Sequence, residues 1–263
     1  MRIIIPTHGR VNQQRTVSEL PRELRSRTIL VCPQQERRRL ACLDDDIEVV
    51  AQPDANMRIA AKRAWIVQFG LDRGYEKILM LDDDLVFATR KSPDDTGLRP
   101  IRGKELLREF DRLEEKLGRE WPHVGFGARQ GNDKLEEVGW QSPGRMRCVL
   151  AYFLPIVARE CKFDLVELRQ DYCIALQLLL KGHPNAIWQT TVVDQKHDAP
   201  GGCSTWRTVE MSDDEAEKFA NLFPQYVSVV ERDYKGLPRK EVTVQWQKAL
   251  RDGQRNRGRL FVC

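Results

Sequence analysis

The chain has 263 residues and a formal net charge of +4, and its 41% hydrophobic and 31% charged residues are typical of a globular protein with a sizeable core. No apolar run approaches the roughly 18 residues of a membrane helix, and the first residues lack the apolar region of a signal peptide, so we expect a cytoplasmic protein without a membrane partner. The seven cysteines are scattered and form no CxxC pair, which argues against a disulfide framework and against a zinc site.

Strand and helix patterns alternate through the first half of the chain. The β-rich runs are Ile3–Ile5, Thr28–Val31, Ile47–Ala51 and Ile78–Leu81. Helix-compatible segments lie between them at Asn12–Leu24, Gln34–Leu43 and Met57–Leu71, the last closed by Gly74. Four such alternations predict an α/β fold with a mainly parallel sheet covered by helices on both faces.

The second half of the chain is less regular. Helices are expected at Gly103–Leu117, at Asp171–Lys181 and from a Ser212 cap to Phe223, and strands at Val124–Gly127, Cys148–Leu154 and Ala186–Val193. Two turn-rich stretches, residues 92–100 and 130–145, are long enough to form site loops. We expect one catalytic domain over residues 1–210 and a basic, helical C-terminal extension over residues 211–263 packed on it.

Four acidic clusters compete for a chemical role. Asp213-Asp214 follows Ser212 at an expected helix start, where carboxylates favour the positive end of the helix dipole, and Asp94-Asp95 lies in a Pro/Gly-containing loop. The Asp44–Asp46 cluster precedes a strand, which places it at the edge of a parallel sheet opposite the usual ligand site. These three clusters are therefore interpreted as structural or solvated.

The fourth cluster, Asp82–Asp84, follows the apolar run Ile78–Leu81 and so lies at the carboxyl end of a strand, where open α/β sheets bind ligands. The apolar Leu85–Phe87 comes directly after it. Because burying three carboxylates against apolar chain is costly unless a cation compensates them, the pattern favours a metal site over a turn or a helix cap. Oxygen ligands suit Mg²⁺ or Mn²⁺.

Three segments in order resemble the GT-A glycosyltransferases. The segment Leu81–Leu85 resembles their DxD motif, and Arg2–Arg10 resembles their opening strand and nucleoside-binding turn. The segment Asn56–Arg63 resembles the basic helix that lies under the nucleotide. Together the three segments cover roughly the first 90 residues, and their order and spacing predict a GT-A fold, a Rossmann-like mixed sheet flanked by helices.

The GT-A resemblance also implies site residues. Asp82 and Asp84 are expected to hold a metal on the donor diphosphate, and Asp83 to face the sugar or ribose. The turn residues Pro6, Thr7 and Arg10 are expected to bind the nucleoside.

Two basic residues before the DxD strand fit the donor diphosphate. Arg58 and Lys62 are spaced i, i+4 and share a helix face, where both could meet the diphosphate. A solvated helix face is the alternative for each residue alone.

The segment Gln170–Gly182 resembles the GT-A helix that begins with an acidic pair beneath the acceptor. Here Gln170 stands in place of the first acid, so Asp171 alone would serve. In an inverting mechanism Asp171 would take the proton of the attacking hydroxyl as general base. A simple N-cap is the alternative role for Asp171.

A late polar loop supplies further candidates. His197 is the expected third metal ligand, because many GT-A enzymes close the metal site with a late histidine and imidazole suits Mn²⁺. Gly201 and Gly202 would let the backbone approach phosphate or sugar closely. Arg207 could bind an anionic group in a bidentate manner.

The late His-containing loop, together with basic chain ends, resembles the TET-associated glycosyltransferases of bacteriophages. Residues 1–43 and residues 232–263 each carry a net charge of +6, around a middle of −8. The resemblance implies transfer from UDP-glucose to 5-hydroxymethylcytosine in double-stranded DNA, with the base extruded from the duplex and the basic ends on phosphates. Trp140, Trp188 and Trp206 are candidate stacking residues, and a solvated role for the basic ends stays open.

Other functions remain as alternatives. A family-2-like glycosyltransferase would act on a saccharide acceptor, and a metal-dependent nuclease or a nucleic-acid-binding protein could also combine clustered acids with basic flanks. A sugar-phosphate nucleotidyltransferase would need a Gly-rich loop after the first strand. The chain instead reads Pro6-Thr7-His8-Gly9-Arg10 there.

Overall fold

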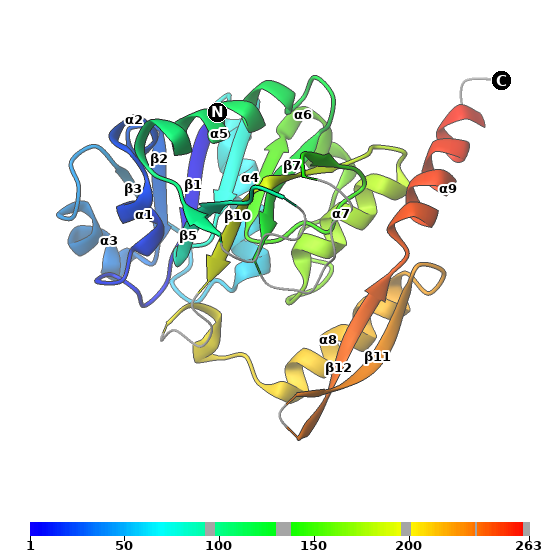
Figure 1. Cartoon of the computed structure of the whole chain (residues 1–263). Coiled ribbons are helices and arrows are strands. Elements are labelled where there is room, and N and C mark those ends of the chain that lie inside the picture. Colours follow the sequence, from blue (N-terminus) through cyan, green and yellow to red (C-terminus); the bar gives the residue numbers. More distant parts are fainter. Residues whose placement is uncertain (93–97, 130–137, 196–200, 235, 260–263) are drawn as a thin grey trace.

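A mixed central sheet forms the body of the protein (Figure 1). The computed structural model describes residues 1–92, 98–129, 138–195, 201–234 and 236–259. The strand order in the sheet is β3-β2-β1-β4-β9-β7-β10-β5-β6, with β8 beside β10. The strands are β1 (Arg2–Pro6), β2 (Thr28–Cys32), β3 (Glu48–Ala51), β4 (Lys77–Leu81), β5 (Leu85–Thr89), β6 (Arg99–Pro100), β7 (His123–Ala128), β8 (Trp140–Gln141), β9 (Val149–Phe153) and β10 (Ala186–Gln195).

The first four strands form the parallel part of the sheet. Strand β1 pairs in parallel with β2 and β4, and β2 pairs in parallel with β3. Strand β9 is antiparallel to both β4 and β7, while β10 runs parallel to β7 and antiparallel to β5. The mixed, mostly parallel sheet flanked by helices confirms the expected fold class. The strands expected around residues 124–127, 148–154 and 186–193 are present as β7, β9 and β10, whereas β5, β6 and β8 were not expected. The directions of the strands are not evident from periodicity.

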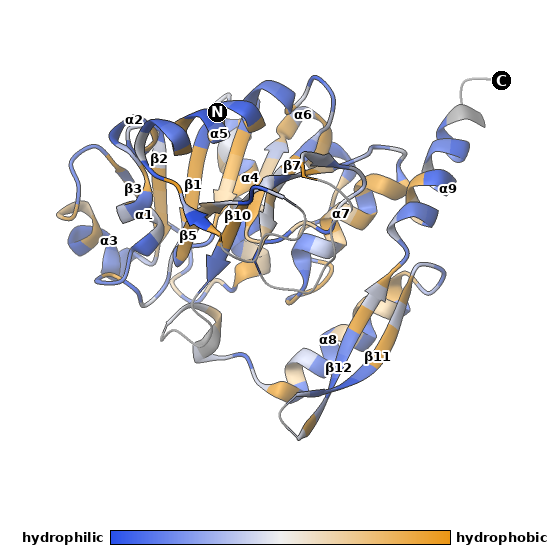
Figure 2. Cartoon of the chain, viewed as in Figure 1, coloured by the Kyte–Doolittle hydropathy of each residue, from blue (hydrophilic) through white to orange (hydrophobic). Residues whose placement is uncertain are grey.

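The strands are apolar because both faces of the sheet are covered. Side chains alternate along each strand, so Ile3 and Ile5 join one core cluster and Ile4 joins the other. Figure 2 shows this apolar centre within a polar surface. On one face lies α5 (Gly103–Lys116), and on the other lie α4 (Ile59–Asp72), α6 (Leu154–Glu160) and α7 (Gln170–Leu180).

The expected helix over Asn12–Leu24 is wrong, because the chain forms two short helices there, α1 (Arg15–Glu19) and α2 (Arg22–Arg25). The break falls at Leu20, which has an extended backbone before Pro21. Proline disfavours a helical conformation in the residue before it, so the helix cannot continue. The next helix, α3 (Gln34–Ala41), is close to its expected position.

The C-terminal region contains the helices α8 (Val209–Leu222) and α9 (Trp246–Arg259). Between them lies an antiparallel hairpin of β11 (Val227–Tyr234) and β12 (Leu237–Val244), which was not expected from the sequence. Helix α8 is capped by Thr208, whose hydroxyl accepts from the Met211 amide at 3.1 Å, so the expected Ser212 cap is wrong. Within the described residues, no helix has the length and apolar character needed to cross a membrane.

Helix α7 joins the C-terminal region to the sheet. Ile174 and Leu178 belong to the core cluster beneath the sheet, whereas Cys173 and Leu176 pack with residues of α8, β11 and α9. In Figure 1 the hairpin lies apart from the sheet, and α9 extends from it past the end of α7. The start of α7 therefore faces both regions of the chain.

Candidate functional site

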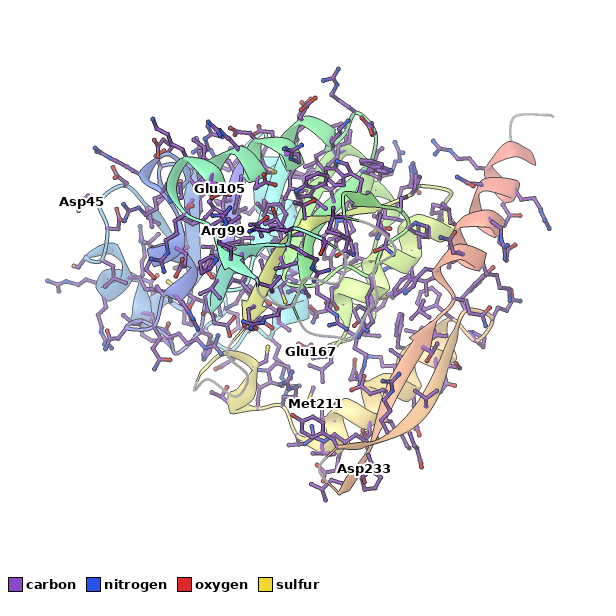
Figure 3. All side chains as sticks on the ribbon, viewed as in Figure 1. Asp45, Arg99, Glu105, Glu167, Met211 and Asp233 are labelled. Atoms are coloured by element: carbon purple, nitrogen blue, oxygen red, sulfur yellow. The ribbon has the colours of Figure 1, made fainter. Side chains whose placement is uncertain are left out.

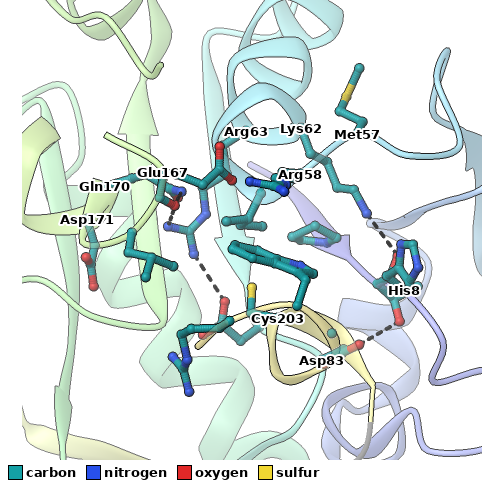
Figure 4. A pocket seen from close by; sticks show the side chains of 18 of the residues that line it. His8, Met57, Arg58, Lys62, Arg63, Asp83, Glu167, Gln170, Asp171 and Cys203 are labelled. Carbon is teal, nitrogen blue, oxygen red and sulfur yellow. Dashed lines mark hydrogen bonds and ion pairs between the residues drawn. The ribbon is translucent and has the colours of Figure 1, made fainter. Parts of the chain in front are cut away.

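The candidate site lies at the carboxyl ends of β1 and β4, where the strand order changes direction around β1. A cleft with a volume of about 280 Å³ opens there. It is lined by the turn after β1, the start of α4, the aspartates after β4, the start of α7, the end of β10 and the segment around the short 3-10 helix η1 (Gly202–Thr205). Figure 4 shows the side chains that face this cleft.

Arg10 bridges two of the three aspartates after β4, because its Nη1 donates to Asp83 and, at 2.9 Å, to Asp84 Oδ2. Asp83 is 5% exposed, and its carboxylate accepts from Thr7 Oγ1 at 2.6 Å and from the Arg10 guanidinium. The outer carboxylates of Asp82 and Asp84 instead meet at one amide, because Gln195 Nε2 donates to Asp82 Oδ2 at 2.9 Å and to Asp84 Oδ1 at 3.1 Å. The outer pair thus converges on one point of the cleft.

Arg63 provides the main positive charge beside Asp82. Its guanidinium donates to Asp82 Oδ1 at 3.3 Å and to Gln170 Oε1 at 3.1 Å (Figure 4). Burial raises the pKa of Asp82 to about 6, against the opposing effect of Arg63, and Asp84 adds to the rise. The glutamine at position 170 is neutral, so it orients Arg63 without competing for its charge.

Lys62 and Arg58 both line the cleft but differ in environment. Lys62 is buried in the first turn of α4, where its Nζ donates to Thr7 O at 3.1 Å and burial lowers its pKa to about 8. Arg58 is exposed just before α4, and its guanidinium lies 5.1 Å from the centre of the Trp206 ring. Contact of either residue with a diphosphate stays a prediction.

Asp171 lies in the first turn of α7 at the wall of the cleft. Arg169 occupies the N-cap position, so the N-cap alternative for Asp171 is excluded. Burial raises the pKa of Asp171, while Arg63, Arg147 and Arg145 oppose the rise. A half-buried carboxylate with a raised pKa beside a cleft suits a proton acceptor, and the general-base role stays a prediction.

The glycine pair packs against the turn after β1. Gly201 has a φ of 91°, and a Cβ there would lie 2.6 Å from Arg10 Cγ and 3.0 Å from Gly9 O. The Gly202 amide donates to His8 O at 2.8 Å, and Gly202 also lines the cleft. The close approach that requires these glycines is thus to the protein's own backbone. Their contact with a donor molecule stays a prediction.

The remaining expected site residues divide into two groups. Pro6 and Arg207 line the cleft, whereas His197 lies outside the described residues. Among the residues that the structure describes, no group of three or more His, Cys, Asp or Glu side chains is arranged to hold a metal ion. Metal binding by Asp82 and Asp84 therefore stays a prediction.

Two residues of the site, Arg63 and Gln195, were not expected there from the sequence. Arg63 stands beside Lys62 in the basic segment that resembles the nucleotide-binding helix, and this position could have indicated that Arg63 belongs to the site. Gln195 ends β10, and nothing in a glutamine at the end of a strand marks it in sequence. Its role depends on the antiparallel pairing of β10 with β5, which brings Gln195 opposite Leu85, directly after the aspartates.

Of the tryptophans considered for stacking, Trp206 lines the cleft. Trp140 and Trp188 pack against each other with ring centroids 5.3 Å apart, and Trp188 Nε1 donates to Glu109 at 2.6 Å. These two rings belong to the packing on the α5 side of the sheet, so their expected role in stacking at the site is wrong.

The other acidic clusters have structural partners. Asp44 pairs with Arg25 at 2.8 Å, and Asp46 pairs with Arg22 at 2.9 Å. Asp45 lies far from Glu167 of the cleft (Figure 3). Asp213 accepts from the Lys240 amide at 2.9 Å and so links α8 to the hairpin. The Asp94-Asp95 pair lies outside the described residues.

The fold and the cleft define a GT-A-like transferase architecture, with an acidic triplet after β4 and basic residues at the start of α4. The model of the TET-Associated Glycosyltransferase family (TAGT) matches residues 1–202, and the chain belongs to this family. The family assignment implies glycosyltransferase activity with a nucleotide-sugar donor.

Comparison with solved structures gives distant similarities. A mannose-1-phosphate geranyltransferase from Thermus thermophilus is 12% identical with a TM-score of 0.47, and 99% of each chain is covered. A 4-diphosphocytidyl-2C-methyl-D-erythritol synthase from Anaerococcus prevotii is 11% identical with a TM-score of 0.44, covering 84% of this chain and 95% of that one. No curated protein is similar enough in sequence to match the chain.

Proposed function

We propose that the protein is a hexosyltransferase that moves glucose from UDP-glucose to the hydroxymethyl group of 5-hydroxymethylcytosine in DNA, in a reaction that depends on Mn²⁺ or Mg²⁺. The observation that carries this proposal is the convergence of Asp82 and Asp84 on one point of the cleft, 2.9 and 3.1 Å from a shared amide nitrogen. The DNA would be that of a bacteriophage, modified in the cytoplasm of the host cell.

The donor set fits a hard divalent cation. Two carboxylates supply anionic oxygens, and Mg²⁺ typically binds through one or two carboxylates plus substrate phosphates rather than in an all-protein cage. When bound, the cation would stabilise the negative charge that develops on the leaving diphosphate. Asp82 and Asp84 would hold it, and His197 remains the proposed third protein ligand.

Basic residues around the cleft support the binding of a diphosphate. Arg58 and Lys62 reach the cleft from the start of α4, and Arg207 reaches it from the segment after η1. Because Lys62 is buried, its charge is poorly compensated by water, so a phosphate oxygen would be a favourable partner. Pro6, Thr7 and Arg10 stand at the end of β1, where they would contact the nucleoside.

The reaction requires one proton transfer. The acceptor hydroxyl forms a bond to C1 of the sugar, the bond from C1 to the phosphate oxygen breaks, and the diphosphate leaves with the electron pair. In an inverting reaction Asp171 takes the hydroxyl proton, and its raised pKa makes this carboxylate a better proton acceptor than an exposed aspartate.

The test is transfer to DNA. The protein is incubated with Mn²⁺, a panel of nucleotide sugars and DNA that contains either 5-hydroxymethylcytosine or cytosine, and the digested nucleosides are analysed by mass spectrometry. A hexosyl adduct on 5-hydroxymethylcytosine alone is expected with UDP-glucose. Transfer to a saccharide but not to DNA would overturn the proposed acceptor, and nicking of supercoiled plasmid would favour a nuclease.

A further inference from the structure

A second cavity lies between the sheet and the C-terminal hairpin. It is distinct from the cleft around Asp82–Asp84, which is called the donor cleft below. The volume of the second cavity is about 570 Å³. Gly127 and Gln189 line it from β7 and β10, and Val242 lines it from β12. The family match ends at residue 202, so the hairpin side of this cavity lies beyond the matched region.

The described lining of this cavity is basic. Among the described residues that line it, four are arginines and none is acidic. The arginines come from separate parts of the chain: Arg90 follows β5, Arg145 and Arg147 precede β9, and Arg232 lies on β11. Bringing four guanidinium groups to one cavity raises the local positive potential, which favours an anionic ligand.

This basic cavity meets the donor cleft at the start of α7. Tyr172 lines the basic cavity, and the preceding residue, Asp171, lines the donor cleft. Arg147 Nε donates to the Tyr172 hydroxyl at 3.1 Å, and the Arg145 guanidinium lies 4.5 Å from the centre of the Tyr172 ring. The two cavities are therefore lined by consecutive residues at the start of α7, one of which is Asp171.

Aromatic surface accompanies the charge. Trp246 lines the cavity together with Tyr172, and the two rings stand perpendicular with centroids 5.9 Å apart. Guanidinium groups that bind phosphate and aromatic faces that stack on bases are the two elements of single-stranded nucleic-acid binding. An acidic peptide would use the arginines but would leave the partly exposed ring of Trp246 without a partner.

We propose that the basic cavity binds the acceptor polynucleotide, with phosphodiester groups on Arg90 and Arg232 and the extruded base directed past Tyr172 toward Asp171. This assignment rests on the proposed DNA acceptor and adds the place where the acceptor binds. It divides the enzyme into a donor cleft on one side of the α7 start and an acceptor cavity on the other. Extrusion of the base would be needed because a base stacked in a duplex cannot reach a carboxylate inside the protein.

The experiment measures binding of a short duplex that contains 5-hydroxymethylcytosine, over a range of salt concentrations. The test variant is Arg90→Gln/Arg232→Gln, and the charge-matched control is Arg108→Gln/Arg119→Gln, which removes two exposed arginines on α5 and just after it, outside both basic chain ends. Near 0.1 M salt the test variant should lose roughly tenfold in affinity per lost phosphate contact, and its salt slope should flatten by about two units. The control should bind as the wild type does.

A further variant, Thr243→Asp, and a further ligand, UDP, separate a loss of DNA binding from a loss of folding. Thr243→Asp places an acid on the exposed β12 wall of the cavity and should weaken DNA binding in the same way. Binding of UDP with Mn²⁺ should be unchanged in all three variants, which also shows that they fold. Equal DNA affinity in the test and control variants, or absence of DNA binding by the wild type, would overturn the acceptor site. If the variants lose DNA affinity but the wild type transfers no sugar to DNA, the polynucleotide site stands and the proposed reaction fails.

Discussion

Thr7 Oγ1 donates a hydrogen bond of 2.6 Å to Asp83 Oδ2, and this bond joins the carboxyl ends of β1 and β4. Gln14 Nε2 in turn donates to Thr7 Oγ1 at 2.8 Å, so the threonine hydroxyl is held on both sides. Asp83 is turned toward Thr7 and Arg10, and the outer carboxylates of Asp82 and Asp84 both accept from Gln195, while Arg10 also donates to Asp84. The middle aspartate thus fixes the conformation in which its neighbours converge.

The first prediction concerns the metal. Asp84→Asn should abolish turnover and weaken the Mn²⁺-dependent binding of UDP, because it removes one of the two proposed anionic oxygen ligands. Isothermal titration of UDP with and without Mn²⁺ measures the effect. Asp45→Asn is the control, since Asp45 is exposed at the opposite edge of the sheet. Normal turnover of Asp84→Asn, or full activity of the wild type with excess chelator, would contradict the assigned role.

The second prediction concerns the general base. Asp171→Asn should lower kcat by roughly a hundredfold or more, as expected when general catalysis is lost, while the affinity for UDP barely changes. Asp164→Asn, which alters an exposed aspartate shortly before α7, serves as the control. Steady-state kinetics and UDP titration together give the answer. Loss of UDP binding with kcat intact would mean that Asp171 serves the donor instead.

The third prediction concerns the buried lysine. Lys62 is 3% exposed and burial lowers its pKa to about 8, so its charge is costly to the fold. Lys62→Met should therefore keep or raise the free energy of unfolding, yet lower the affinity for UDP on the order of tenfold or more, because the proposed charged hydrogen bond to phosphate would be lost. Urea unfolding and UDP titration measure the two effects. Lys104→Met on α5 should change neither, and a destabilised Lys62→Met with normal UDP affinity would assign Lys62 to structure alone.

The fourth prediction concerns pH and stability. His123 is fully buried in β7, where Nδ1 donates to Ala151 O at 2.9 Å and Nε2 has no hydrogen-bond partner among the described residues. Burial lowers its pKa to about 4, whereas an unfolded histidine titrates near pH 6.5. Between these values the unfolded state binds more protons, so stability is lost as the pH falls from about 6.5 to 4.

For His123 this linkage amounts to about 2 kcal/mol between pH 7 and pH 5. The variant His123→Phe retains the ring stacked on Tyr152 but cannot titrate. It should lose less of its free energy of unfolding than the wild type over this range. Urea unfolding at both pH values provides the comparison, and an equal loss in the two proteins would rule out His123 as the titrating group.

The first half of the fold could be predicted because its strands are short apolar runs separated by helix-compatible segments. The position of Asp82–Asp84 after β4 followed from that alternation, as did the separation of Asp44–Asp46 from the site. Pro21 was the missed local signal, since proline interrupts the expected first helix. Each of these conclusions depends on residues close together in sequence.

The rest of the site depends on tertiary pairing. The antiparallel course of β9 and the register of β10 with β5 decide that Gln195 meets Asp82, and no local pattern contains that information. The partners of the arginines in the basic N-terminal segment likewise could not be predicted from local sequence. Its arginines suggested phosphate contacts, yet Arg22 and Arg25 form ion pairs with acids of the loop before β3.

Helix α7 has consequences for how the protein unfolds. One side of it completes the core beneath the sheet, and the other completes the core of the C-terminal region, where Gly253 of α9 comes so close that a Cβ would lie 2.0 Å from Leu179 O. Neither core retains its packing once α7 is lost. Residues on both sides of position 202 are therefore expected to melt in one cooperative transition, and the C-terminal region cannot open without exposing the helix that carries Asp171.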